Sequence, residues 1–564
     1  MNRQKHLYRL LLAALLTFPA IMLQASGDRN GEIRNYAWKV LNEWKIPGMS
    51  VSVVKGDSIV FSEGFGIKEK GKSIEKNGPD AAITSSTLFH IGSMTKAFTA
   101  AVIQSVVDDG LLSWDDTVKV LMPDFEWYDK DAGDTLLVKD FLTHRTGLVA
   151  QAGTYIANLG YNREDIYRMF KYIPTVYAPG EKFAYNNITF IIAARLVEKV
   201  TGKSWEDNIR ERIFKPLGMD SSVPGSKGYL DAGQNASKAH YFGYRKGKDG
   251  KGSIYTTTLY GEERALHWVD VIGPAGSISS NADDMAKWVR FHLDRGKTVK
   301  TVYPDSRDRY AFLDDSIAQN TFFPDLPSTD FRIYPYKDSI TVISEKGMEF
   351  LHTGADTVNV LDNSVTEYGY CWYIETNDRY KVIYHTGTTW GFTGICGFVP
   401  ELDLGFAILC NSEVSEYARK GLMRRIIDLY MPDCNPDSLK DWSGEGLKQW
   451  FEDKTKPRRR AVPCTIARSN AEPDPARLTG TYKKASPFGD ANVSMKNGKL
   501  YLTIGRYGWT HRLDHYRGNE YWLRSDGHTF PVYFHNYTKD SEAPVEFEID
   551  FNYNEDFGPW IKAD

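Results

Sequence analysis

Three serine–lysine pairs in this chain have the spacing at which an amine can activate a hydroxyl group. The pattern Ser-x-x-Lys begins at Ser52, Ser73 and Ser93. A serine hydroxyl attacks a carbonyl slowly unless an adjacent base accepts its proton, and a neutral lysine can be that base. The pattern therefore indicates acyl-transfer chemistry only where both side chains share a face and the lysine is shielded from water.

The first two pairs do not meet these conditions. Ser52 and Lys55 lie in β-branched runs around a Gly-Asp turn, which predicts a hairpin. Residues three apart on a strand point to opposite faces, so these side chains cannot meet. Ser73 and Lys76 lie in the charged, turn-rich stretch EKGKSIEKNGPD, where nothing would desolvate the lysine.

The third pair lies at the start of a predicted buried helix, HIGSMTKAFTAAVIQSVVDDG (90–110). Apolar residues recur there at helical spacing, so Ser93 and Lys96 would share a face and apolar surroundings would lower the lysine pKa. Ser93 would also lie near free backbone N–H groups at the positive end of the helix. A helix-capping serine beside a lysine whose amine reaches solvent would give the same sequence pattern. This segment alone therefore does not decide between a catalytic pair and a structural one.

A tyrosine and an asparagine further along the chain favour the catalytic interpretation. Tyr185 and Asn187 lie in AYNN, which follows APGEKF and precedes the predicted helix ITFIIAARLVEKVTG. A loop tyrosine and a helix-capping asparagine would give the same triplet, so it is a weak signal by itself. Its value comes from its combination with the Ser93 segment.

Two His-x-Gly triplets are candidates for a strand on the opposite wall of a site. His352 lies in the polar stretch LHTGADTVN, with no strand pattern around it. His385 follows a β-branched run and precedes two further apolar runs. Gly387, inside that predicted strand, indicates close approach by a ligand or another backbone. We therefore choose His385.

The rest of the sequence predicts the elements that must position these residues. The chain has 564 residues, 42% of them hydrophobic, with a formal charge of −4, which is enough for two or three domains. Strand signals at both ends of the main unit predict one sheet with helices inserted between them and a cleft at the junction. The expected parts are a signal peptide (1–26), a main unit (27–435) with a helical insertion (about 114–295) and a loop-rich insertion (about 297–345), a linker (436–472) and a small antiparallel β domain (473–564).

Several functional classes are excluded by the same inspection. Residues 1–26 combine a positive start, a short apolar run and the cleavage site LQAS, so we expect an exported protein, periplasmic or secreted, without a transmembrane segment. Near-neutral charge argues against nucleic acid as a partner, and the one basic stretch, KTKPRRRAVP, is short and Pro-rich, as expected for a solvated linker. The stretch GIKEKGKS (66–73) matches a phosphate loop, but Gly78 and Pro79 stop the helix that such a loop requires. No zinc signature occurs, and no metal or cofactor is implied.

Serine, lysine, tyrosine, asparagine and a strand-borne basic residue, in this order, resemble the serine β-lactamase and penicillin-binding protein family. The likeness is strongest to class C β-lactamases and their relatives, the D-amino-acid peptidases and esterases. The blocks TLFHIGSMTKAFTA, VKDFLTHRTGL, APGEKFAYNN and HTGTTWGF carry it, over roughly residues 32–430. The resemblance implies an α/β (α+β) fold, with an antiparallel sheet flanked by helices and an inserted all-helical domain. The stretch from LTGTYKK onward resembles a β-barrel-like domain that is appended to many such hydrolases.

The resemblance also assigns roles to the candidate residues. Ser93 would be the nucleophile, and Lys96 and Tyr185 would share the general-base role, with no decision between them. Asn187 would hydrogen-bond the amide side chain of the substrate.

The predicted strand would supply the opposite wall. His385, Gly387 and Thr388 would contact the substrate there, and the backbone N–H groups of Ser93 and Thr388 would form the oxyanion hole. Four aromatic residues are candidates for the walls of the cleft, and core packing explains them equally well: Tyr155, Tyr161, Trp268 and Trp390.

One departure from the family bears on the substrate. Penicillin-active members usually carry Lys-Thr-Gly on this strand, where the chain has His385-Thr386-Gly387. A lysine is a permanent cation for a substrate carboxylate, whereas a histidine of pKa ~6.5 is mostly neutral at pH 7. We therefore expect a peptidase, amidase or esterase that forms an acyl-enzyme on Ser93. Its expected substrates are small peptides with D-amino acids, including peptidoglycan fragments, or esters.

Two alternatives stay open at this point. A β-lactamase would hydrolyse β-lactam antibiotics, and nitrocefin turnover would identify it. A penicillin-binding-like sensor or peptidoglycan-binding protein would show burst kinetics without turnover. The sequence leaves the oligomeric state open as well.

Overall fold

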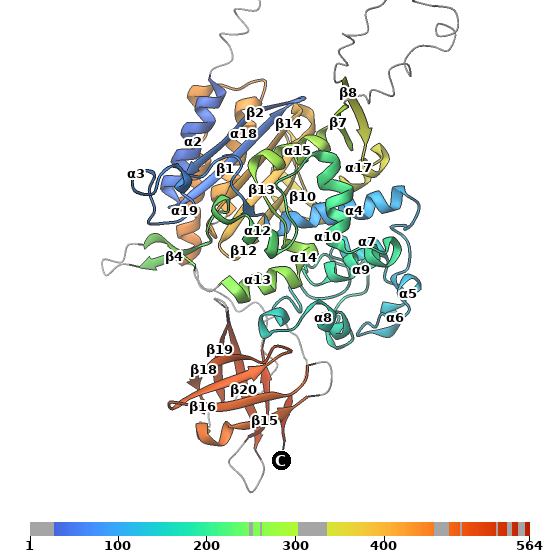
Figure 1. Cartoon of the computed structure of the whole chain (residues 1–564), viewed down its shortest axis with the longest axis vertical. Coiled ribbons are helices and arrows are strands. Elements are labelled where there is room, and N and C mark those ends of the chain that lie inside the picture. The colour runs from blue at the N-terminus through green and yellow to red at the C-terminus, as the bar shows by residue number, and fades with distance from the viewer. Residues whose placement is uncertain are drawn as a thin grey trace, which may run out of the picture.

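The computed structural model describes residues 28–246, 252–259, 262–302, 336–361, 363–414, 416–455, 473–484, 488–525, 528–537, 544–550 and 559–563. The expected signal peptide (1–26) lies outside this part of the chain. Figure 1 shows a larger body of sheet and helices, with a β-barrel set below it. Among the described residues, no helix is long and apolar enough to cross a membrane.

Eight antiparallel strands form the sheet of the larger body, in the order β2-β1-β14-β13-β12-β11-β10-β9. The first two strands of the chain therefore join strands from the second half, as the sequence predicts, although the second half supplies six strands where the sequence shows three strand-like runs. The strands are β1 (Gly48–Lys55), β2 (Ser58–Gly66), β9 (Gly354–Leu361), β10 (Ser364–Gly369), β11 (Tyr373–Asn377), β12 (Lys381–Thr389), β13 (Phe392–Val399) and β14 (Leu404–Cys410). The central strands β13 and β14 are buried along their whole length, because helices cover both faces.

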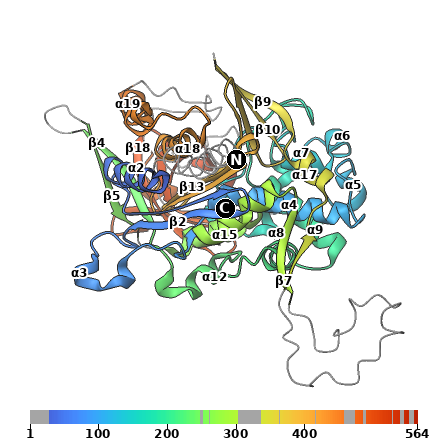
Figure 2. The ribbon, with the colours of Figure 1, turned by 90° about the horizontal axis from the view of Figure 1, so that it is seen from above.

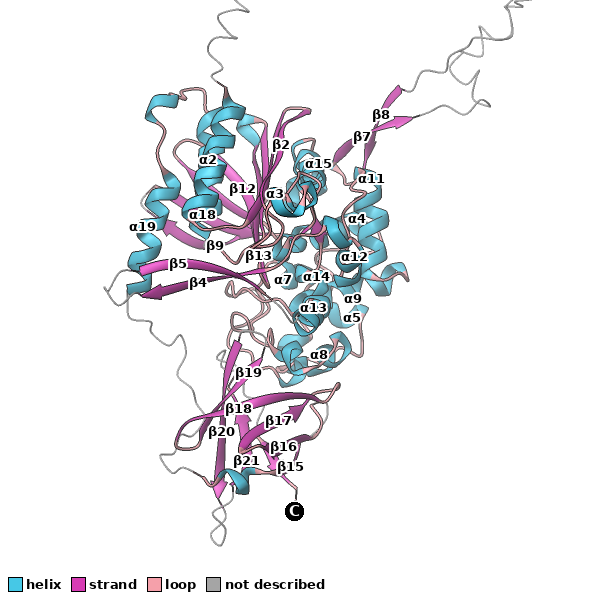
Figure 3. Cartoon of the chain, turned by 60° about the vertical axis from the view of Figure 1, so that its left-hand side comes forward, coloured by secondary structure: helices cyan, strands magenta, loops and turns pink. Residues whose placement is uncertain are grey.

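One face of the sheet is covered by the first helix and by two late helices, α2 (Arg29–Glu43), α18 (Glu416–Tyr430) and α19 (Trp442–Thr455) (Figure 3). The helix α19 shows that residues 442–455 are not part of the linker expected over 436–472, and residues 456–472 lie outside the described part of the chain. The helix packs against α2 and α18, and its Trp450 ring lies 6.0 Å from that of Trp44. The sequence of this segment is mostly polar, so the few apolar side chains that pack it against the neighbouring helices are not evident from the sequence.

The other face carries α15 (Ala282–Leu293) and the helical region, in which α4 (Thr95–Asp108) and α9 (Thr189–Thr201) are the longest buried helices. These two helices pack against each other and against the short α14 (Gly273–Gly276). The remaining helices are α3 (Ile74–Asn77), α5 (Val118–Leu121), α6 (Lys130–Gly133), α7 (Val138–Leu142), α8 (Arg163–Met169), α10 (Trp205–Ile209), α11 (Lys215–Leu217), α12 (Ser226–Asp231), α13 (Glu262–Val271) and α17 (Glu345–Leu351).

Two hairpins lie where the sequence predicts helices or loops. The pair β4 (His240–Lys246) and β5 (Gly252–Thr258) interrupts the helical insertion, and β7 (Lys297–Val302) pairs with β8 (Tyr336–Thr341) in the insertion expected to be loop-rich. Figure 2 shows them on opposite sides of the molecule. Each hairpin pairs only with itself, so few of its positions are buried and the strand pattern in the sequence is weak.

The C-terminal β domain is a closed antiparallel barrel of eight strands, which confirms the predicted β domain. Its strands are β15 (Gly480–Lys483), β16 (Ala491–Lys496), β17 (Lys499–Ile504), β18 (Trp509–Arg517), β19 (Glu520–Ser525), β20 (His528–Tyr537), β21 (Pro544–Ile549) and β22 (Trp560–Lys562).

The barrel packs against a short segment of the helical region. The rings of Tyr155 and Phe530 are 5.3 Å apart, and Ser525 Oγ donates a hydrogen bond to the Asn158 carbonyl. A Cβ on Gly505 would lie 1.8 Å from the Leu159 carbonyl oxygen, so the two backbones are in direct contact.

Candidate active site

Ser93 lies in a tight turn that leads into α4. A 3₁₀ turn covers Gly92–Met94, and the α-helix follows at once. Two glycines allow strand β12 to touch this turn. A Cβ on Gly92 would lie 2.8 Å from the Thr388 backbone nitrogen, and one on Gly387 would lie 1.8 Å from the Ile91 carbonyl oxygen. Larger residues at either position would push the strand away from Ser93.

Lys96 is fully buried one helical turn after Ser93. Its Nζ lies 3.1 Å from Ser93 Oγ, 2.8 Å from Asn187 Oδ1 and 3.0 Å from the carbonyl oxygen of Ala275 in α14. Burial lowers the pKa of Lys96 to about 7, so a large fraction of the amine is neutral near neutral pH. This is the condition that the Ser-x-x-Lys pattern requires, and the exposed Lys55 and Lys76 do not meet it.

Tyr185 enters the site from the loop before α9. Its carbonyl accepts a hydrogen bond from the Gln151 backbone N–H at 2.7 Å, and the next backbone N–H donates to His144 Nδ1 at 3.1 Å. Lys96 Nζ lies 4.7 Å from the centre of the Tyr185 ring. Burial raises the pKa of Tyr185 well above 10, against the opposing effect of a hydrogen bond with Ser93. The phenol is therefore protonated in the resting protein.

Asn187 lines the cavity beside the amine of Lys96. Its Oδ1 accepts from Lys96 Nζ, and its Nδ2 donates to Gln151 Oε1 at 3.0 Å. The resemblance assigns this side chain to the substrate, and the structure shows a further contact, with the amine of Lys96.

His385 lies on β12 and is held as a neutral imidazole. Its Nδ1 donates to the Thr386 carbonyl at 2.6 Å, and its Nε2 accepts from the Tyr368 hydroxyl at 3.2 Å. Burial and the charge of Lys96 lower the pKa of His385 to about 3. The residue therefore supplies no cation to a substrate carboxylate at physiological pH.

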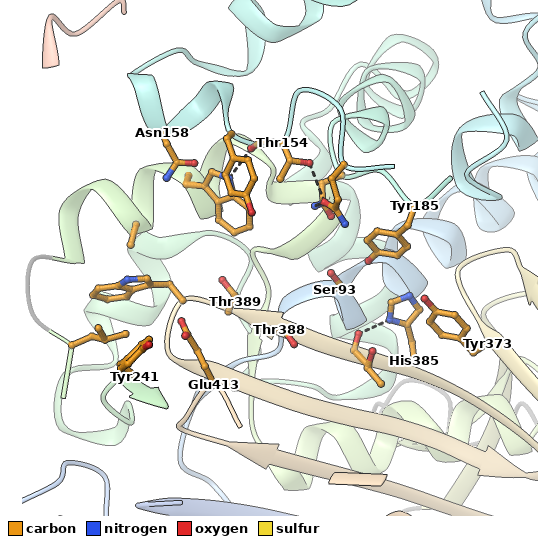
Figure 4. A pocket seen from close by; sticks show the side chains of 18 residues that line it. Ser93, Thr154, Asn158, Tyr185, Tyr241, Tyr373, His385, Thr388, Thr389 and Glu413 are labelled. Carbon is orange, nitrogen blue, oxygen red and sulfur yellow. Dashed lines mark hydrogen bonds between the residues drawn. The ribbon is translucent and has the colours of Figure 1, made fainter. Parts of the chain in front are cut away.

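These residues surround one cavity of about 670 Å³ between β12 and the helical region (Figure 4). Of the four aromatic candidates, three line it and Tyr161 does not. Tyr161 is buried beneath the barrel, with its hydroxyl donating to the Phe488 carbonyl. The predicted residues that line the cavity are Ser93, Tyr155, Tyr185, Asn187, Trp268, His385, Thr388 and Trp390.

The other His-x-Gly triplet lies elsewhere. His352 is half-buried and packs against the buried His292, with 2.8 Å between Nε2 and Nδ1 of the two rings, and it does not line the cavity. Strand β9 begins at Gly354, so the expectation of no strand near this triplet is wrong. Across the described residues, no cluster of three or more His, Cys, Asp or Glu side chains could hold a metal ion.

Four residues at the site escape detection in the sequence. His144 and Gln151 hold the loop of Tyr185, as described above. Arg419 is buried in α18, and its Nη1 donates to the Gly387 carbonyl at 2.7 Å, which supports β12 from behind. Glu413 lines the cavity after β14. Only His144, in the block VKDFLTHRTGL, lies within a stretch that the resemblance had marked.

A serine beside a buried amine and a buried phenol, in a cavity between an antiparallel sheet and a helical region, defines the site of a serine hydrolase. A family model described as Beta-lactamase matches residues 39–429. The chain belongs to the β-lactamase family of serine hydrolases, which includes penicillin-binding proteins.

Two relatives and one solved structure illustrate the breadth of the family. Unguisins hydrolase ungD' of Aspergillus campestris (strain IBT 28561) is 28% identical over 439 residues, 75% of this chain and 68% of the relative. N-acetylmuramyl-L-alanine amidase of Bacillus subtilis (strain 168) is 28% identical over 293 residues, 49% of this chain and 66% of the relative. The octameric penicillin-binding protein homologue from Pyrococcus abyssi superposes with a TM-score of 0.51 at 21% identity, over 92% of this chain and 98% of that one, which shows the shared fold.

Proposed function

We propose that this protein is an exported serine hydrolase that forms an acyl-enzyme on Ser93 and cleaves an amide or ester bond in peptides that contain D-amino acids. The observation that carries the proposal is the 3.1 Å contact between Ser93 Oγ and the Nζ of a buried lysine whose pKa is lowered to about 7. A base positioned in this way contributes about 10²–10⁴ in rate.

The two pKa shifts support one assignment of the proton transfers. In water a lysine and a tyrosine have similar pKa values, but here burial lowers that of Lys96 and raises that of Tyr185. The neutral pair is favoured, so Lys96 accepts the proton of Ser93 while Tyr185 keeps its own. Tyr185 then donates its proton to the leaving group and takes back the proton held by the Lys96 ammonium, so both side chains are neutral again and can activate water for deacylation.

The developing oxyanion would be stabilised by backbone N–H groups of Ser93 and Thr388. The pairing of β12 with β11 ends at Tyr384, so the following residues of this edge face the Ser93 turn instead of a strand. The close contact at Gly92 supports this arrangement, because it holds the Thr388 nitrogen beside the turn. One oxyanion donor contributes on the order of 3 kcal/mol.

The substrate class rests on the neutral strand residue and on the relatives. His385 is uncharged, which disfavours the carboxylate of a penicillin. One relative is named a hydrolase of unguisins and another an N-acetylmuramyl-L-alanine amidase, and both names are consistent with the hydrolysis proposed here. The D-amino-acid preference follows from the resemblance to D-amino-acid peptidases.

The test is labelling by a fluorophosphonate probe and hydrolysis of a p-nitrophenyl ester. Ser93→Ala should abolish both and leave the circular dichroism spectrum unchanged. Ser73→Ala is the matched control, since Ser73 has the same Ser-x-x-Lys spacing on an exposed turn. Undiminished labelling of the Ser93 variant would refute the proposal. D- and L-aminoacyl amides and nitrocefin, tested on the wild type, then separate a peptidase from a β-lactamase. A burst of product release without further turnover would indicate the alternative function, a penicillin-binding-like sensor.

Export is part of the proposal and rests on residues 1–26 alone. The measurement is the N-terminal sequence of the protein recovered from the cell envelope or medium. A mature chain that begins near residue 27 supports export, and an intact N-terminus in the cytoplasm contradicts it.

A further inference from the structure

The described lining of the cavity around Ser93 includes a carboxylate that the proposed chemistry does not use. Among the described residues that line it, Glu413 is the only carboxylate, and none is a lysine or an arginine. His385 contributes no charge, since its pKa is lowered to about 3. The described lining of the proposed substrate cavity therefore carries a single acidic side chain, that of Glu413.

Backbone hydrogen bonds hold this carboxylate beside two aromatic side chains. The Gly391 N–H donates to Glu413 Oε1 at 2.9 Å, the Glu413 N–H donates to the His240 carbonyl at 3.2 Å, and the His240 N–H donates to the Gly391 carbonyl at 3.2 Å. The residues next to His240 and Gly391 are Tyr241 and Trp390, which also line the cavity. These hydrogen bonds therefore hold the backbone segments that carry Glu413, Tyr241 and Trp390 next to one another.

No cation of the protein neutralises Glu413 within the described residues, where it forms no ion pair and its hydrogen-bond donor is a backbone N–H group. The nearby His240 is neutral, because its Nδ1 donates to the Asn411 carbonyl, its Nε2 accepts from the Lys70 N–H, and burial lowers its pKa. Burial also raises the pKa of Glu413, as expected for a carboxylate without a counter-ion.

The position of Glu413 indicates which part of a substrate it meets. Figure 4 shows Glu413 and Tyr241 at one end of the cavity and Tyr185 and His385 at the other, with Ser93 nearer to the latter. Tyr185 serves the leaving group in the proposed mechanism, so the leaving group occupies its end. The acyl part of the substrate then extends toward Glu413.

We infer that the Glu413 end of the cavity binds a primary ammonium group on the acyl part of the substrate, with the aromatic faces of Tyr241 and Trp390 beside it. A buried carboxylate forms charge-assisted hydrogen bonds with an ammonium group, and aromatic faces attract cations. The inference rests on the proposed function and narrows its substrate class to esters and amides of amino acids with a free amine. A substrate with an acylated amine or a carboxylate at that end is disfavoured.

The experiment compares Glu413→Gln with wild type on paired substrates. Each pair is a p-nitroanilide or thioester of an amino acid with its amine free or acetylated, with one, three or five methylene groups between the amine and the carbonyl carbon. The free-to-acetylated ratio of kcat/KM should fall about 10- to 100-fold in the variant at the best chain length, the range expected for a charged hydrogen bond. The control is Glu401→Gln, which removes the same charge at the exposed turn between β13 and β14, away from the cavity. It should keep the wild-type ratio.

A second readout is independent of turnover. Benzylammonium should protect Ser93 of the wild type from a fluorophosphonate probe better than benzyl alcohol does, and Glu413→Gln should remove the difference. Equal ratios and equal protection in variant and wild type would overturn the inference while Ser93 still reacts, which leaves the proposed function standing. Absence of any labelling or turnover in the wild type would instead refute the proposed function, and this inference with it.

Discussion

The hydrogen bond from Lys96 Nζ to Asn187 Oδ1, 2.8 Å long, predicts a shift in the pH dependence of acylation. A carbonyl oxygen stabilises the ammonium form more than the neutral amine, and a hydrogen bond to a charged group is worth about 1.5–3 kcal/mol. Replacing Asn187 by leucine of similar size should therefore lower the lysine pKa by about one to two units.

The sign of the effect follows from which form reacts. Acylation requires neutral Lys96, so its rate rises with pH through the lysine pKa of about 7 in the wild type. At pH 6 the wild type should work at about a tenth of its plateau rate, and Asn187→Leu at about half or more of its own plateau. The variant is thus slower at its plateau and relatively more active in acid.

The assay is the pre-steady-state acylation rate with an uncharged p-nitrophenyl ester between pH 5 and 9. The control is Gln151→Leu, which removes the partner of Asn187 Nδ2 and leaves the bond to Lys96 in place. It should keep the wild-type inflection. An inflection that stays at the same pH or moves upward in Asn187→Leu would refute the assignment of Lys96 as the base.

Three further predictions concern the supports of the site. Gly387→Ala places a Cβ 1.8 Å from the Ile91 carbonyl, so it should displace β12 and lower kcat about 10²–10³-fold, measured with the same ester, while fluorophosphonate still labels the protein slowly. His385→Gln should lower the plateau rate without moving the inflection near pH 7, because His385 is neutral over this range; a lost or shifted acid limb would show that His385 titrates there. Gly505→Ala should loosen the barrel and expose its junction to limited proteolysis, whereas Gly498→Ala, with a similar positive φ but open space around it, should not; equal cleavage of both would refute the contact.

The fold was largely predictable because its signals are local. A β-branched run marks β12, apolar runs mark β13 and β14, and helical spacing marks α4. The glycines Gly92 and Gly387 are also informative in the sequence, since at both positions another segment of backbone lies too close for a side chain. The segments that were mispredicted, such as α19 and the hairpin β4–β5, bury only a few side chains each, and their apolar pattern is correspondingly short.

The supports of the site were not predictable for a different reason. The carbonyl of Ala275 approaches Lys96 across 179 positions of sequence, and Arg419 reaches Gly387 from a helix on the far face of the sheet. Neither contact can be recognised in the local sequence. Every residue has a carbonyl group, so Ala275 is not distinctive, and a charged residue on a helix, such as Arg419, is usually exposed. Only the packed structure shows that these groups are buried and what they touch.

Asn187 can bind the substrate, as the resemblance implies, and also accept the hydrogen bond from Lys96 that the structure shows. Its Oδ1 accepts a hydrogen bond from Lys96 Nζ, which uses one of its two lone pairs. Its Nδ2 carries two hydrogens, of which Gln151 takes one. Because Asn187 lines the cavity, the second hydrogen is available to a carbonyl of the acyl part. One side chain can therefore tune the base and orient the substrate, and leucine at this position should affect the inflection through the first contact and the plateau through the second.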